Sequence, residues 1–137
     1  SVRKVKDAVK IPVIVNGDIE DGKTASNALQ ASGADAIMIG RASCGNPWIF
    51  QMIRTQLNDV KYFPPDNITV LNLLEKYVDS LYSFYGLYRG LLIARKHVNW
   101  FLQKSELRYL VDSKEFNKLK DVSTQFKFFR KIRKRIA

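Results

Sequence analysis

Two short apolar runs, each followed by a glycine within two residues, constrain the fold more than any other feature of the chain. Residues 11–15 are mostly β-branched and lead into Asn16-Gly17-Asp18, and residues 36–39 lead into Gly40-Arg41. Between them, residues 22–32 carry a small apolar face and stop at a glycine, which is typical of a helix. Both runs are apolar throughout and do not alternate with polar residues. They therefore predict two parallel strands, covered on both faces, in a sheet built from strand–helix units.

Two strands are too few to close a barrel or to form an independent parallel sheet. We therefore expect neighbouring strands upstream of Ser1, and we expect the chain to be a fragment. Residues 1–10 fit this view, because they have the composition of a helix end. A further helix is predicted from residue 48 to residue 57, after a loop at 42–47.

A rigid turn at Pro64-Pro65 marks the predicted boundary between a domain at 1–65 and a domain at 66–137. Beyond it, three amphipathic helices are expected: one ending at Gly86, one at about 88–104, and one that runs from Asp112-Ser113 beyond Ile132. The first has an apolar stripe with helical spacing, made of Val70, Leu73, Leu74, Tyr77, Val78, Leu81 and Phe84.

The net charge of +10 is unevenly distributed. Residues 1–65 carry eight basic and six acidic side chains, whereas residues 66–137 carry fifteen and seven. A basic and aromatic second half predicts a polyanionic partner, RNA or DNA before a membrane. Charge that merely keeps the protein soluble is the alternative. Since no run of about 18 apolar residues occurs, no membrane-spanning segment is expected.

The two strand-end glycines predict a phosphate site. At the carboxyl end of a parallel strand, a glycine lets the backbone approach an anion closely, so that N–H groups can point at it. Arg41 could add a charge-assisted hydrogen bond. Plain turn glycines are the alternative. A metal site is not expected, since the chain has one histidine and one cysteine.

Three segments carry motifs of a known family: IPVIVNGDI at 11–19, ASGADAIMIGR at 31–41 and GNPWIF at 45–50. They resemble the tRNA-dihydrouridine synthase family, most closely its bacterial B-type branch. The resemblance implies an α/β plus all-α fold: the last two βα units of a TIM (β/α)8 barrel, followed by a C-terminal helical bundle. It also implies that these barrel segments hold the phosphate of FMN. The cofactor-binding residues would be Asn16, Gly17, Asp18, Gly40 and Arg41.

The second domain carries its own resemblance, through YGLYRG at 85–90 and ARKHVNWF at 94–101. These segments are similar to the start of the family's helical tRNA-binding domain, apart from Asn99, where the pattern has glycine. Helical spacing points Lys96 outward, with its two neighbours on opposite flanks. The predicted RNA-binding residues are Arg89, Arg95, Lys96, His97 and Trp100. A helix that merely shows its charged face is the alternative, as it is for the basic tail at 127–135.

The resemblance implies FMN- and NADPH-dependent reduction of uridine to 5,6-dihydrouridine in tRNA, in the cytoplasm. In the family a cysteine in a mid-barrel loop is the general acid, and that loop would lie upstream of this chain. Cys44 follows the last strand and is not expected to be catalytic. The chain by itself is therefore expected to be inactive, and its partners would be tRNA and the missing N-terminal part of the barrel.

Two other functions remain open at this stage. The chain could be a non-catalytic RNA-binding remnant of such an enzyme, which a stop codon or frameshift in the coding DNA upstream of Ser1 would indicate. It could also belong to another FMN barrel, such as a dihydroorotate dehydrogenase. Such a barrel would lack the motifs at 85–101, which argues against it.

Overall fold

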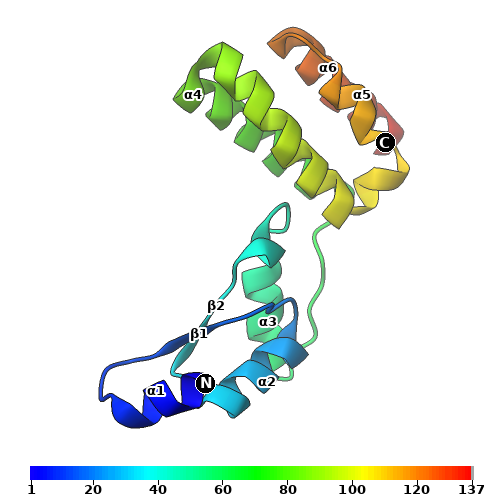
Figure 1. The fold of residues 1–137 in the computed structure, drawn as a ribbon. Coiled ribbons are helices and arrows are strands. Elements are labelled where there is room, and N and C mark those ends of the chain that lie inside the picture. Colours follow the sequence, from blue (N-terminus) through cyan, green and yellow to red (C-terminus); the bar gives the residue numbers. More distant parts are fainter. Residues whose placement is uncertain (137) are drawn as a thin grey trace. The chain divides into compact units, whose positions relative to one another are not determined.

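The computed structural model describes residues 1–136 and divides into two compact units, Ser1–Pro64 and Pro65–Ala137 (Figure 1). The first unit contains α1 (Val2–Ala8), β1 (Ile14–Asn16), α2 (Gly22–Ser32), β2 (Ala36–Met38), the 3-10 turn η1 (Arg41–Ser43) and α3 (Ile49–Leu57). The second contains α4 (Asn67–Lys104), the 3-10 turn η2 (Glu106–Tyr109), α5 (Ser113–Asn117) and α6 (Val122–Ile136).

The two strands pair in parallel, as predicted, with Val15 opposite Ile37. Each is three residues long and therefore shorter than its apolar run. The helix between them begins and ends at the predicted residues. The Asp21 side chain accepts a hydrogen bond from the backbone of Thr24 at 2.7 Å, and the Thr24 hydroxyl accepts one from the Asp21 backbone. This reciprocal cap lowers the pKa of Asp21, mainly through the backbone and side-chain hydrogen bonds of Thr24.

The core of the first unit lies between α2 and α3 and centres on Ala25, Ile49 and Ile53. The strands contribute little to it, because Val15 alone among their residues is buried. Ile14 and Met38 are 61% and 54% exposed. The described residues therefore do not cover both strand faces by themselves, and the cover expected from strands and helices upstream of Ser1 stays a prediction.

Residues 1–65 expressed alone should aggregate, because these strands present unpaired edges and bare apolar faces. Size-exclusion chromatography and thermal unfolding would measure this. Replacing Ile14 and Met38 by threonine should reduce the aggregation while keeping β-forming residues in place. A monomeric segment with a cooperative melt would show that the unit needs no further strands.

In the second unit, α4 is interrupted at Gly86, whose φ of 75° and ψ of 165° are not helical. The break predicted between two helices is thus present as a kink. The start of α4 is fixed by Asp66, which accepts a hydrogen bond from the Thr69 backbone at 2.8 Å. Gly86 forms the kink, whereas Gly90 allows close packing. A Cβ atom at Gly90 would lie only 2.9 Å from the Tyr82 Cα atom.

The prediction of a single final helix from Asp112-Ser113 beyond Ile132 is wrong. Helix α5 ends at Asn117, and α6 begins at Val122. The reason is a second cap: the Asp121 carboxylate accepts a hydrogen bond from the Thr124 backbone at 2.8 Å, which starts a new helix.

The core of the second unit combines apolar rings with one buried amide. Phe116 and Phe129 are fully buried, and so is Gln125. Tyr82 donates its hydroxyl hydrogen bond to Gln125 Oε1, and Gln125 Nε2 donates to the Leu91 carbonyl at 3.4 Å. Burial, and to a lesser extent Asp79, raises the pKa of Tyr82 to about 12, so its hydroxyl remains a donor. This network ties α6 to both halves of α4.

Candidate phosphate site and basic helical face

The carboxyl ends of β1 and β2 leave open space around two glycine backbones. Gly17 and Gly40 each follow their strand by one or two residues, and the parallel pairing places Asn16 opposite Met38. A Cβ atom built at either glycine would meet no neighbouring atom within 4 Å. A ligand could therefore approach both backbones closely, which is the property that a phosphate site of this type needs.

Arg41 and Asp18 form an ion pair beside these glycines, with 2.6 Å between Arg41 Nη2 and Asp18 Oδ1. The sequence suggested both residues for the site but not this contact between them. Their side chains are 90% and 81% exposed. Solvent screens a pair of this kind, so it adds little stability and can open when an anion competes for the guanidinium.

The segment after Gly40 differs from the arrangement in which a long helix begins at the phosphate. It forms the three-residue turn η1, in which the Ser43 hydroxyl donates to the Gly40 carbonyl at 2.8 Å. Cys44 follows this turn and is partly exposed, with a free thiol. Among residues 1–136, no group of three acidic, histidine or cysteine side chains could hold a metal ion.

On α4, Arg89 and Lys96 are exposed and project from the same helix as a half-buried Trp100. The Lys96 ammonium lies 4.5 Å from the Trp100 ring centroid, a cation–π contact. Within the described part of the chain, neither basic residue forms an ion pair with an acidic side chain. Their charges are therefore available to an external anion.

Arg95 and His97 are turned toward the rest of the helical unit. Arg95 Nη2 donates to the Leu119 carbonyl at 3.1 Å, while its Nε is buried without a partner. His97 Nδ1 lies 3.2 Å from the Tyr77 hydroxyl, and its ring meets Trp100 edge-on at 5.2 Å. Burial, helped by the nearby Lys96 charge, holds the pKa of His97 below its usual value. The imidazole is therefore neutral near pH 7.

Sequence reasoning missed Arg108 and Tyr109, which lie in η2 between the predicted helices. The Arg108 guanidinium is 4.6 Å from the Tyr109 ring centroid. An arginine beside an aromatic residue in a basic domain was the only available signal.

Within the described residues, no helix is long and apolar enough to cross a membrane.

The fold and these surfaces define an α/β unit with open strand-end glycines, joined to a basic helical unit. The family model described as "Dihydrouridine synthase (Dus)" matches residues 1–136. The chain belongs to the dihydrouridine synthase family. It is similar to tRNA-dihydrouridine synthase B of Yersinia pestis, with 44% identity over 130 residues that cover 91% of this chain and 39% of the relative. The tRNA-dihydrouridine synthase B of Escherichia coli K12 is 45% identical, again over 91% of this chain and 39% of the relative.

These comparisons confirm the resemblance seen in the sequence. The Serratia marcescens relative, at 43% identity, is covered over 37% of its length and 91% of this chain. The chain thus spans about two fifths of the length of the relatives that it matches.

Proposed function

We propose that this chain is part of an enzyme that reduces uridine to 5,6-dihydrouridine in tRNA, with FMN as cofactor and NADPH as reductant. The observation that carries the proposal is the pair of accessible strand-end glycines, Gly17 and Gly40, on adjacent parallel strands of a chain in this family. In the complete protein, residues 1–65 would supply the last two βα units of a TIM barrel.

The residues present fit the phosphate of FMN. The open backbone at Gly17 and Gly40 allows close approach, and Arg41 offers a guanidinium held nearby by Asp18. Asn16 and Asp18 add side-chain groups that can orient the loop or a ribityl hydroxyl. When bound, reduced FMN supplies the hydride for the uracil ring. The residues of this chain bind and position that cofactor, and none of them is assigned a proton-transfer role.

The helical unit at 66–137 is proposed to bind tRNA. Arg89 and Lys96 are suited to phosphate contacts because they are exposed and have no acidic partner within residues 1–136, and Trp100 lies beside Lys96. Arg95 and His97 are better suited to holding this surface in place, because their polar groups face Leu119 and Tyr77. A tRNA substrate also favours action in the cytoplasm.

A non-catalytic RNA-binding remnant is the second candidate. One observation favours it: the helical unit has its own buried core, whereas the strands of the first unit are largely exposed. The coding DNA upstream of Ser1 separates the two candidates. An open frame that encodes a barrel with the loop cysteine supports the enzyme, and a disrupted frame supports the remnant.

A chimera tests the cofactor site directly. This chain would replace the corresponding segment of the Escherichia coli relative, to which it is 45% identical. We expect the chimera to bind FMN and to reduce uridine in unmodified tRNA. Gly40→Val should weaken FMN binding at least about tenfold, since the side chain would occupy the space needed for backbone approach.

Cys44→Ala is the matched variant, because it changes a side chain in the same loop without blocking a glycine. Its turnover should stay close to that of the parent chimera. FMN titration of the apoprotein and a tRNA reduction assay measure the two effects. Loss of turnover in Cys44→Ala, or unchanged FMN affinity in Gly40→Val, would contradict the assignment.

A further inference from the structure

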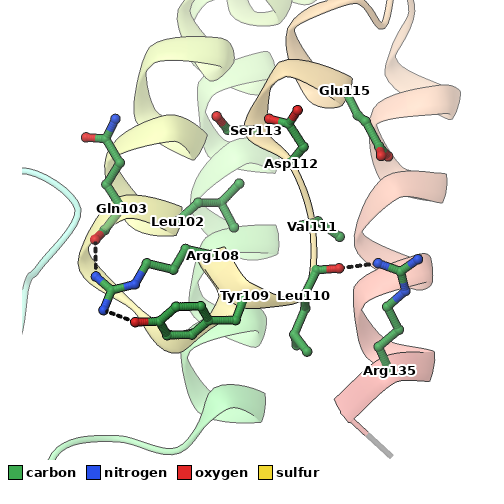
Figure 2. Close-up of a pocket in the computed structure, with 10 residues that line it drawn as sticks. All are labelled: Leu102, Gln103, Arg108, Tyr109, Leu110, Val111, Asp112, Ser113, Glu115 and Arg135. Carbon is green, nitrogen blue, oxygen red and sulfur yellow. Dashed lines mark hydrogen bonds between the residues drawn. The ribbon is translucent and has the colours of Figure 1, made fainter.

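A hollow between η2 and the end of α6 presents an exposed aromatic ring beside a fixed guanidinium (Figure 2). Tyr109 is 70% exposed. Arg108 Nη2 donates to the Tyr109 hydroxyl at 2.7 Å, and Arg108 Nη1 donates to the Gln103 carbonyl at 3.2 Å. The two hydrogen bonds hold the guanidinium against the ring and leave much of the ring surface accessible.

This hollow continues into a basic face of α6. Five basic side chains line a second hollow at the spacing of one helix face: Lys127, Arg130, Lys131, Lys134 and Arg135. The opposite face of α6 is anchored by the buried Phe129 and Ile132. Arg135 lines both hollows and donates to the Leu110 carbonyl, as Figure 2 shows. The basic face extends about 12 Å along the helix axis, from residue 127 to residue 135.

Part of this charge is not neutralised by the protein itself. The Lys131 ammonium forms an ion pair with the Glu115 carboxylate at 2.7 Å, so the Glu115 charge is already paired. Asp112, the other acidic residue of the first hollow, accepts a hydrogen bond from the Lys114 backbone at 2.8 Å. Within residues 1–136, no acidic side chain lies within ion-pair distance of Arg130 or Lys134.

We propose that Tyr109 is a stacking platform for an unpaired nucleotide of RNA, and that the basic face of α6 binds the neighbouring phosphates. Aromatic rings and arginine guanidinium planes stack on bases that are free of a duplex, whatever their sequence. The basic residues recur once per helical turn, so they can follow a phosphate backbone. The inference rests on the proposed tRNA-binding role and adds a surface on η2 and α6 to the one on α4.

The composition of the site favours a base over a purely ionic ligand. Charge that only solubilises a protein needs no exposed ring, and an isolated phosphate would not use one. Here Tyr109, the one aromatic residue of η2, is held by Arg108 beside the basic face of α6, where Arg130 and Lys134 have no acidic partner within residues 1–136. A single-stranded segment of RNA offers both the free base face and the phosphates.

The test compares binding of the full 137-residue chain to a single-stranded RNA oligonucleotide and to a blunt-ended RNA duplex with the same number of phosphates, by fluorescence anisotropy. Tyr109→Ala should weaken single-strand binding at least about fivefold, since stacking on one aromatic ring contributes at that level. Duplex binding should stay unchanged. Tyr109→Phe keeps the ring and loses only the hydroxyl that accepts from Arg108, so it should weaken single-strand binding less than Tyr109→Ala does. Replacing Arg130 and Lys134 by glutamine should weaken binding to both.

Phe84→Ala is the matched control, because Phe84 is 82% exposed in the same helical unit but lies outside the residues proposed to bind RNA. An equal loss in Phe84→Ala and Tyr109→Ala would overturn the assignment to Tyr109. So would an equal loss of single-strand and duplex binding in Tyr109→Ala. If the parent chain binds RNA but Tyr109→Ala changes nothing, the stacking site alone fails. A parent chain that binds neither RNA would overturn both this site and the proposed tRNA-binding role.

Discussion

Replacing Phe129 by alanine should lower the free energy of unfolding of the helical unit by about 3–5 kcal/mol. Phe129 is fully buried, and its ring lies 5.5 Å from that of Phe116 and 5.9 Å from that of Phe126. The substitution would leave a cavity where α4, α5 and α6 meet. The loss would be a large part of the stability of a unit of this size.

Phe84→Ala provides the matched control for this measurement. It removes the same ring from the same unit, but Phe84 is 82% exposed, so the expected change stays within about 0.5 kcal/mol. Urea unfolding followed by helical circular dichroism gives both values. Similar losses in the two variants would mean that the core is not centred on the rings of α5 and α6.

Phe84 also shows where helical periodicity fails as a guide to burial. Its spacing placed it on the apolar stripe with Leu74 and Val78, which are indeed buried, yet its ring lies in solvent against Tyr85. It is two residues from the kink at Gly86, where the two halves of α4 separate. Periodicity assumes a continuous helix axis and cannot show which residues lose their neighbours at a kink.

Local signals predicted the elements of the first unit well. The reciprocal cap of Asp21 and Thr24 fixes α2 within the chain itself, so its bounds could be inferred from sequence. The split between α5 and α6 carries the same kind of signal, because Asp121 and Thr124 repeat the spacing of Asp21 and Thr24. It is hidden in the sequence because Phe116, Leu119 and Val122 keep an apolar helical spacing across the break.

The candidate sites also combine features that are visible in the sequence with contacts that are not. The glycines at the two strand ends were visible in the sequence, because they follow apolar runs within two residues. The pairing of Asp18 with Arg41 was not, since it joins residues 23 positions apart. Likewise, helical spacing predicted that Lys96 points outward, but it could not show that Arg95 faces Leu119 and His97 faces Tyr77.

Binding of tRNA by the chain should depend steeply on salt, and replacing Arg89 and Lys96 together by alanine should reduce that dependence. Each phosphate contact contributes about 0.7 to 0.9 to the slope of log affinity against log salt, so the double variant should lose about 1.4 to 1.8. At 0.1 M salt this corresponds to binding that is about 25- to 60-fold weaker. Both side chains are exposed, so the fold should persist.

The control for this variant removes the same charge from the first unit, where Lys10 and Lys23 are also exposed. If tRNA responded only to net charge, Lys10→Ala with Lys23→Ala would weaken binding as much as the α4 pair. A located interface predicts a much smaller change, because neither lysine belongs to the basic face of α4. Circular dichroism would show whether both variants remain folded. Equal effects in the two pairs would mean that the basic face of α4 contributes general charge and no specific phosphate contacts.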